Sequence, residues 1–229
     1  MGTIKILEQT TKNPIQFIGQ CAGIAYGSDV TDENKNYKRG MNCIKAGHGR
    51  VLEFCDVYMD MQGYSARVIR EFMRHVADGL TVIQESTRYI NYSNFDYIIP
   101  PKIEENWDTT RDIYVSTMDM ISDAVTSLID IYNIPKEDAA NLLPLGMTTG
   151  LSCKHNLRTL EAMAHQRFCS RAYWEFQNLM QDLKDALSEY SPEWKILCDM
   201  LFIPKCERYG YCEEEFSCGR YPMKNDVID

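Results

Sequence analysis

Apolar side chains recur along the chain at two spacings, which predict a mixture of strands and helices. Alternating patterns favour strands over residues 4–9 and 51–61, and the second of these contains Phe54, Val57 and Met59. Helical spacing favours helices over residues 14–26, 31–47 and 63–76, with Thr31 opening the second helix and Gly47 closing it. We therefore expect an α+β fold in which helices dominate.

The second half of the chain continues this pattern with longer helices. Residues 109–133 carry apolar side chains at helical spacing and predict one long helix, while residues 154–187 predict another that has room for a joint. Pro144 and Gly146 interrupt the stretch between them. With no internal repeat or flexible linker, we expect a single helix-rich domain with a small mixed sheet over residues 1–195, followed by a cysteine-rich C-terminal cap over residues 196–229.

The charge balance limits the classes of partner. The chain has 24 basic and 33 acidic side chains and a net charge of -9, so its long-range field repels nucleic acids and anionic membrane surfaces. It has neither a secretory signal pattern nor an apolar run of the roughly 20 residues that a spanning helix needs. We expect a cytoplasmic protein without nucleic-acid or membrane partners, in which any anionic ligand meets a local basic pocket.

One predicted helix face mixes guanidinium groups with large apolar side chains. Asn156, Leu160, Met163, Arg167 and Arg171 share this face at a period of 3.6 residues. Burying an unpaired charge is costly, so the arginines either pair with acidic residues elsewhere or bind a polar or anionic ligand. Both explanations stay open at this level.

Two further segments also carry candidate ligand-binding residues. Arg74 and His75 end a predicted helix, and a polar segment containing Ser86 and Arg88 follows. His48 lies between two glycines in a turn that brings backbone N–H groups close to a ligand, although such a turn is more often purely structural. Arginine forks at several positions suit a nucleotide or a dinucleotide, because each fork gives paired hydrogen bonds to a phosphate or a pyrimidine carbonyl.

Taken together, "GHGRVLEF", "RH" followed by "QESTRY", and "NLRTLEAMAHQRFCSRAYWE" resemble the flavin-dependent thymidylate synthases in order and spacing, over roughly residues 15 to 190. The resemblance implies a homotetramer with active sites between subunits. It also implies FAD as cofactor, dUMP as substrate, NADPH as reductant and 5,10-methylenetetrahydrofolate as one-carbon donor.

The resemblance also implies roles for individual residues. His48 and Glu53 match flavin-proximal positions, Arg74 and His75 match the start of the Arg-His-Arg signature, and Asn156 and Arg158 match flavin contacts on the long helix. The implied nucleotide-binding residues are Glu71, Gln84, Glu85, Ser86, Thr87, Arg88 and Arg167. Arg88 would meet the phosphate, and Arg167 would be the catalytic residue, stabilising negative charge on the uracil.

The chain departs from the family pattern at several positions. Val76 replaces the third basic residue of the signature, Ala140 replaces an arginine that often holds the nucleotide, and Ala162 replaces an asparagine. These departures leave two alternatives open. One is a flavoenzyme that modifies C5 of another pyrimidine nucleotide, and the other is a non-catalytic nucleotide-binding or flavin-binding paralogue.

Four of the nine cysteines cluster near the end of the chain, at Cys198, Cys206, Cys212 and Cys218. We expect no metal in the catalytic site, and the resemblance implies that none of the cysteines acts as a nucleophile. The spacing of the four cysteines nevertheless leaves a tetrahedral zinc site open, beside reduced thiols or disulfides formed after purification.

Overall fold

The computed structural model describes residues 2–75 and 80–227, which divide into two compact units. The first unit holds residues 2–3, 61–74 and 82–152, and the second holds residues 4–60, 75, 80–81 and 153–227. The fold is α+β and rich in helices, as expected. Across the described residues, every helix is too short or too polar to span a bilayer.

The strands form one four-stranded sheet in the order β1 (Thr3–Ile6), β2 (Asp56–Ser65), β4 (Thr148–Asn156) and β3 (Thr81–Gln84). The sheet is antiparallel, so the expected mixed sheet is wrong. Beyond the strand ends, the N–H of Leu7 donates to the carbonyl of Tyr58 at 2.9 Å, and that of Leu157 donates to Cys55 at 2.8 Å.

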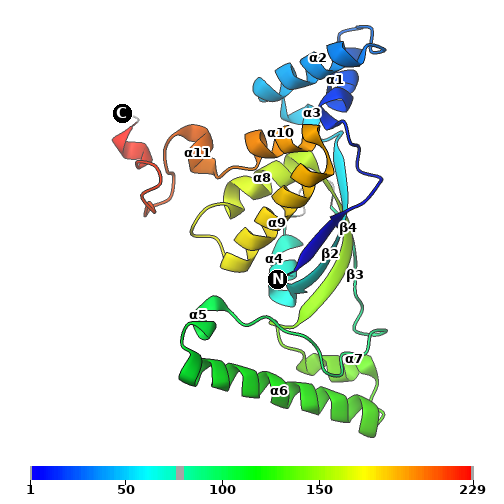
Figure 1. Ribbon diagram of the computed structural model, residues 1–229, viewed down its shortest axis with the longest axis vertical. Helices are drawn as coiled ribbons and strands as arrows, with labels where there is room; N and C mark the ends of the chain where they lie inside the picture. The colour runs from blue at the N-terminus through cyan, green and yellow to red at the C-terminus, as the bar shows by residue number, and fades with distance from the viewer. Residues whose placement is uncertain (1, 76–79, 228–229) are drawn as a thin grey trace. The chain divides into compact units, whose positions relative to one another are not determined.

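In the second unit, α1 (Pro14–Ala25) and α2 (Glu33–Lys45) lie side by side (Figure 1). Gly19 permits this close approach, because a Cβ there would collide with the backbone carbonyl of Asn36. Asp32 caps α2 by accepting the N–H of Lys35 at 3.0 Å, so the expected cap at Thr31 is wrong by one residue. A carboxylate is the better acceptor and also interacts favourably with the positive end of the helix.

The same unit continues with four helices: α3 (Gly49–Leu52), α8 (Leu157–Arg167), α9 (Trp174–Tyr190) and α10 (Pro192–Leu201). Glu193 at the start of α10 is buried, and its Oε2 accepts the backbone N–H groups of Ile15 at 2.7 Å and Gln16 at 3.2 Å. The carboxylate thus satisfies donors that the first turn of α1 leaves unpaired. The chain ends with α11 (Lys205–Tyr209) and η4 (Lys224–Asp226).

The first unit contains α4 (Ala66–Phe72), α5 (Pro101–Glu104), η1 (Trp107–Arg111), α6 (Asp112–Thr126), η2 (Ser127–Ile131), α7 (Lys136–Ala139) and η3 (Ala140–Leu142). The elements η1, α6 and η2 run without interruption, as Figure 1 shows for the long helix, so the helix expected over residues 109–133 is confirmed. Met118 on its buried side forms a small core with Tyr92, Phe95 and Met147.

Several expected boundaries are wrong because tertiary pairing overrides local pattern. The strand expected over residues 51–61 begins at Asp56 after the short α3, and it extends into the start of the helix expected over residues 63–76. Residues 154–187 divide into the end of β4, α8 and α9, so the joint is real and the first three residues are strand. The first strand is shorter than expected and ends at Ile6.

Candidate active site

A cavity of about 390 Å³ lies at the start of α8, within the second unit. Its lining consists of Glu53, His75, Asn156, Arg158, Thr159, Ala162 and Gln166. Four of these are residues that the sequence singled out for a flavin: Glu53, His75, Asn156 and Arg158. Most of the lining side chains carry a polar group, which suits the polar or charged part of a ligand better than an apolar one.

Glu53 lies between two guanidinium groups. Its carboxylate pairs with Arg158 through one oxygen and with Arg50 at 2.8 Å through the other. The hydrogen bond from Arg158 is the main cause that holds the pKa of Glu53 below its usual value, and Arg50 adds to it. Gly49 leaves room for this arrangement, because a Cβ there would lie 3.2 Å from Nε of Arg158. The carboxylate therefore stays ionised and orients Arg158 at the cavity.

Asn156 is buried and forms the N-cap of α8. Its Oδ1 accepts the N–H of Thr159 at 2.9 Å and the hydroxyl of Thr159 at 3.0 Å. The cap fixes the first turn of α8, whose positive end faces the same cavity as Arg158. Asn156 thus has a structural role that also places a positive helix end beside the cavity.

Arg167 at the end of α8 forms a cluster with His75 and Phe176, which we call the Arg167 cluster. The guanidinium donates through Nε to Nε2 of His75 at 3.1 Å, and its second nitrogen lies 3.0 Å from the same atom. The guanidinium carbon lies 4.5 Å from the ring centre of Phe176, and His75 meets that ring edge-on at 5.6 Å. Because Nε2 accepts from a cation, the proton of His75 belongs on Nδ1. The cluster holds the guanidinium in one orientation.

His155, at the end of β4, is buried next to this cluster. Burial, and secondly the proximity of His75, lower the pKa of His155 to about 4. The unfolded chain binds this proton near pH 6.5, whereas the folded chain does not until about pH 4, so folding becomes less favourable as pH falls between these values. We expect the free energy of unfolding to drop by about 2 kcal/mol through this residue between about pH 7.5 and about pH 5.

Urea unfolding of His155→Gln at the two pH values measures this contribution. The variant should lose less stability on acidification than the parent chain, while His48→Gln, which changes an exposed histidine, should retain the full loss. Equal acid sensitivity in His155→Gln and the parent chain would show that His155 does not couple folding to pH.

The segment from Gln84 to Arg88 belongs to the first unit and forms a turn after β3. Gln84 donates to the hydroxyl of Thr149 at 3.4 Å, and the N–H of Glu85 donates to the carbonyl of Gly150 at 2.9 Å. The hydroxyl of Ser86 accepts the N–H of Arg88 at 3.3 Å. Glu85 also lines a second cavity of about 350 Å³, together with Tyr92 and Thr149. Thr87 is not among the residues that line this cavity.

The expected basic residues of the first unit, Arg74 and Arg88, are exposed to solvent. Nε of Arg88 pairs with Glu137 on α7 at 2.8 Å, and the Arg88 side chain is 65% exposed. Glu71 pairs with Arg67 at 3.7 Å along α4, and Arg74 is exposed just after that helix. Surface pairs of this kind contribute about 0–1 kcal/mol, so a phosphate can displace Glu137 from Arg88 at little cost.

The structure brings five of the expected residues together in the second unit: Glu53, His75, Asn156, Arg158 and Arg167. The other expected residues belong to the first unit, on α4 or just after it (Glu71 and Arg74) and in the segment Gln84, Glu85, Ser86, Thr87 and Arg88. Convergence of Arg74 and Arg88 with Arg167 stays a prediction. His48 is exposed, lies just before α3 and is not among the residues that line the cavity, while Val76 lies outside the described residues.

Sequence reasoning missed three contributors. Thr159 and Gln166 line the cavity, and Phe176 supports the guanidinium of Arg167. Thr159 is the natural third residue after an Asn cap, so a capping pattern identifies it. Phe176 comes from the following helix, and nothing in the local pattern indicates that it returns to Arg167.

The zinc site considered from the sequence is not supported, because among the described residues no group of three or more His, Cys, Asp or Glu side chains is placed to hold a metal ion. Cys198 is fully buried in α10, where burial raises the pKa of its thiol to about 12. Cys206, Cys212 and Cys218 lie together elsewhere, around a different cavity that Cys169 also lines.

Comparison with known proteins identifies the family of this chain. The family model described as thymidylate synthase complementing protein matches residues 6–193. The chain is 28% identical to the flavin-dependent thymidylate synthase of Nitratidesulfovibrio vulgaris, covering 80% of this chain and 76% of that one. It is 26% identical to the enzyme of the same name from Clostridium tetani, covering 95% and 93% of the two chains.

A solved structure supports the same assignment at the level of the fold. The flavin-dependent thymidylate synthase of Helicobacter pylori, solved with FAD and dUMP, superposes with a TM-score of 0.66 at 20% identity, covering 85% of this chain and 98% of that one. Since the family model covers most of the chain, including every residue expected to bind flavin or nucleotide, the assignment does not depend on any single motif. The chain belongs to the flavin-dependent thymidylate synthases.

Proposed function

We propose that this chain is an FAD-dependent thymidylate synthase that converts dUMP to dTMP, with 5,10-methylenetetrahydrofolate as one-carbon donor and NADPH as reductant. The supporting observation is the cavity at the start of α8, where Glu53, Asn156 and Arg158 lie beside a histidine that positions Arg167. Relatives that match most of the chain carry the name of this activity.

The residues present fit the polar part of a flavin dinucleotide. Arg158 and the positive end of α8 suit a pyrophosphate or a ring carbonyl, and Glu53 keeps Arg158 directed at the cavity. Asn156, His75 and Gln166 supply further hydrogen-bonding groups. Ala162 leaves open space where many members of the family have an asparagine. Bound FAD, once reduced by NADPH, would supply the hydride that reduces the transferred carbon to a methyl group.

Arg167 is the residue that we assign to the pyrimidine. Its guanidinium is oriented by His75 and Phe176 before substrate arrives, which reduces the reorganisation needed during reaction. Directed at the carbonyl edge of the uracil, it would stabilise negative charge on the carbonyl oxygen while C5 forms its bond to the one-carbon unit and the bond between that unit and the folate nitrogen breaks. C5 subsequently releases its proton to water.

The turn after β3 is the part that we assign to the phosphate. Arg88 is exposed, pairs with Glu137 at the surface and lies over the ring of Tyr89 at 5.8 Å, and Ser86 presents a hydroxyl beside it. A dianionic phosphate competes with Glu137 for the guanidinium because a bidentate charge-assisted pair is stronger than a surface carboxylate pair.

We further propose that the active enzyme is a homotetramer with its sites between subunits, as the resemblance implies. Exposed apolar side chains support an assembly: in the first unit, Ile113, Met120 and Ile131 on the long helix are each more than 60% exposed, and so is Ile83 in β3. Exposed apolar surface of this kind marks subunit contacts in soluble proteins. Light scattering on the purified chain measures its mass directly.

The activity is tested by tritium release from C5-labelled dUMP in the presence of FAD, NADPH and 5,10-methylenetetrahydrofolate. We expect a yellow protein that releases tritium only when all three are present. Mass spectrometry of the product distinguishes a methyl group from a hydroxymethyl group, and parallel reactions with UMP and dCMP identify the nucleotide. If the protein binds nucleotide but oxidises no NADPH in any of these reactions, the result would contradict the proposal and favour a non-catalytic paralogue.

A further inference from the structure

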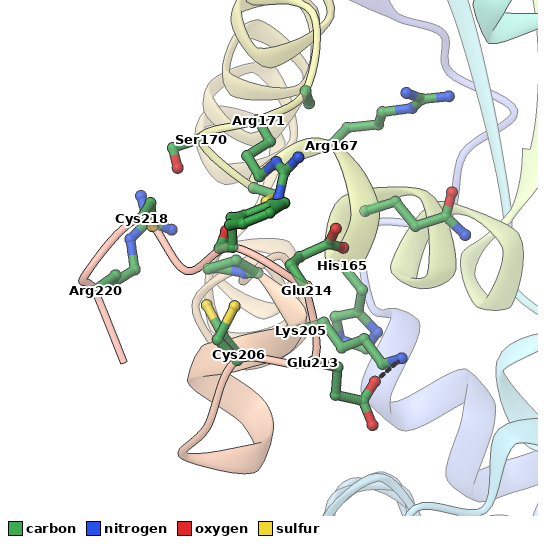
Figure 2. Close-up of a pocket in the computed structure, with 16 residues that line it drawn as sticks. His165, Arg167, Ser170, Arg171, Lys205, Cys206, Glu213, Glu214, Cys218 and Arg220 are labelled. Atoms are coloured by element: carbon green, nitrogen blue, oxygen red, sulfur yellow. Dashed lines mark hydrogen bonds and ion pairs between the residues drawn. The ribbon is translucent and has the colours of Figure 1, made fainter. Parts of the chain in front are cut away.

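The C-terminal tail, residues 202–227, lies beyond the family match, which ends at residue 193. It contains α11 and η4, and within the second unit it meets the end of α8 around a cavity of about 470 Å³ (Figure 2). Gln166 lines this cavity and also the cavity that we assign to the flavin. Arg167, the next residue, ends α8. The tail therefore lies beside the segment that carries the residue we assign to the pyrimidine.

The end of α8 lacks a cap of its own. The last four carbonyl groups of a helix have no partner within the helix, and a glycine or asparagine with a positive φ commonly closes such an end. The turn after α8 has the sequence FCSRAY over residues 168–173, and none of its residues has a positive φ. The carbonyl groups at this helix end therefore depend on water or on other parts of the chain.

Arg220 of the tail supplies one partner for this helix end. Its Nη1 donates to the carbonyl of Phe168 at 3.2 Å, and Phe168 directly follows Arg167. The loop that carries Arg220 is closed by a hydrogen bond of 2.7 Å from the N–H of Cys212 to the carbonyl of Pro222. A cation at the C-terminal end of a helix also interacts favourably with the negative end of the helix dipole. Arg220 thus holds the backbone where α8 ends.

Arg208 on α11 makes a second contact, earlier along α8. It pairs with Glu161, whose side chain is only 12% exposed, and its Nη1 lies 3.4 Å from Nε2 of His165. Burial lowers the pKa of His165, an effect that Glu161 opposes and Arg208 reinforces, so the imidazole is neutral and can accept from the guanidinium. Removing Arg208 would leave a largely buried carboxylate without this partner, which is costly.

Arg167 is thus supported both at its side chain and along the backbone. His75 and Phe176 hold its guanidinium, and the tail contacts the residues on either side of it in the sequence. A third contact, from Arg171 to the carbonyl of Phe216, uses a single donor that a lysine can also supply. Placement of a catalytic group matters because a displacement of about 1 Å can lower a rate by about 100-fold.

We propose that the C-terminal tail positions Arg167 for the reaction. Arg220 acts through the backbone of Phe168, and Arg208 acts through the side chains that it contacts on α8. Both are positioning residues, since they act through Arg167 and not on the substrate itself. This inference rests on the proposed function, in which Arg167 contacts the pyrimidine, and it extends the catalytic apparatus beyond the part of the chain that the family model matches.

The full-length double variant Arg208→Gln/Arg220→Gln tests the proposal. We expect kcat for tritium release from dUMP to fall about 10-fold, with little change in KM for dUMP or in the absorbance of bound flavin. Restoring a donor with Arg220→Lys in place of Arg220→Gln should recover part of the loss. The control is Lys224→Gln, which removes an exposed cation of the tail whose contacts, to Glu213 and Tyr211, stay within the tail. It should retain the parent kcat.

The same two substitutions in an Arg167→Lys background separate positioning from a general loss of stability. The guanidinium is already absent there, so the tail substitutions should change kcat by less than about 2-fold, because residues that act through one group are not additive. An equal 10-fold loss in both backgrounds would overturn the proposal, since the tail would then act elsewhere. Full kcat in the double variant with Arg167 intact would overturn it as well.

Amide hydrogen exchange over residues 165–173, measured without substrate, tests the structural step independently of activity. Exchange should be faster in the double variant than in the parent chain and in Lys224→Gln, because the end of α8 loses its partners. Unchanged exchange would overturn the proposal even if kcat fell. A parent chain that releases no tritium would instead contradict the proposed function, so the two failures are distinguishable.

Discussion

Arg167→Lys is expected to lower kcat/KM for dUMP by about 100- to 1,000-fold, because the lost groups stabilise developing charge on the uracil. Lysine keeps the positive charge but cannot reproduce the planar fork that contacts His75 through two nitrogens and stacks on Phe176. An ammonium group at this site would be a mobile point charge. Tritium release at saturating and subsaturating dUMP measures the change.

The matched control for this variant is Arg171→Lys. Arg171 lies four residues further along the chain, in the turn after α8, where it is exposed and donates to the backbone carbonyl of Phe216 at 3.0 Å. The control should retain nearly full activity, and both variants should bind FAD, as judged by the absorbance of the bound flavin. Full kcat/KM in Arg167→Lys would remove Arg167 from the catalytic step.

The contrast between Arg167 and Arg171 also shows how far the sequence could define the site. Helical periodicity places both arginines on one face with Asn156, and it leaves open whether they pair with acids or meet a ligand. The structure separates them, because the helix ends at Arg167 and the chain turns before α9 begins at Trp174. Periodicity assumes a continuous helix, so it fails where a turn redirects the second arginine.

The resemblance to a family could identify the residues of the cavity but not their supports. Glu53 and Arg158 are 105 residues apart, and they meet because α3 packs near the start of α8 with a glycine between them. Phe176 reaches Arg167 only because α9 folds back toward α8. Contacts of this kind depend on tertiary packing, which a local sequence pattern does not encode.

Strands were harder to identify than helices for a related reason. Both β3 and β4 contain polar side chains, and β4 also contains Gly150. Their extended form depends on backbone pairing with neighbours distant in the sequence. The long helix of the first unit, in contrast, carries its apolar pattern within a single continuous segment. Local periodicity therefore predicted the helix well and overlooked these two strands.

The second large effect is expected when Arg88, which we assign to the phosphate of the nucleotide, is replaced. Arg88→Gln should raise KM for dUMP by about 100-fold, which corresponds to about 2.7 kcal/mol and to the loss of charge-assisted hydrogen bonds. Glu137→Gln should have the opposite sign and lower KM by at most about 5-fold, because it releases Arg88 from a surface pair worth about 0–1 kcal/mol. Initial rates across a range of dUMP concentrations measure both effects.

Deoxyuridine, which lacks the phosphate, provides the internal comparison. If Arg88 contacts the phosphate, the preference for dUMP over deoxyuridine should collapse in Arg88→Gln, while the low activity on deoxyuridine changes little. Lys102→Gln removes one positive charge from an exposed pair with Glu105 in the same unit and should leave this preference intact. An equal loss on both substrates in Arg88→Gln would mean that this arginine supports the turn after β3, where Ser86 accepts its N–H, and does not bind the phosphate.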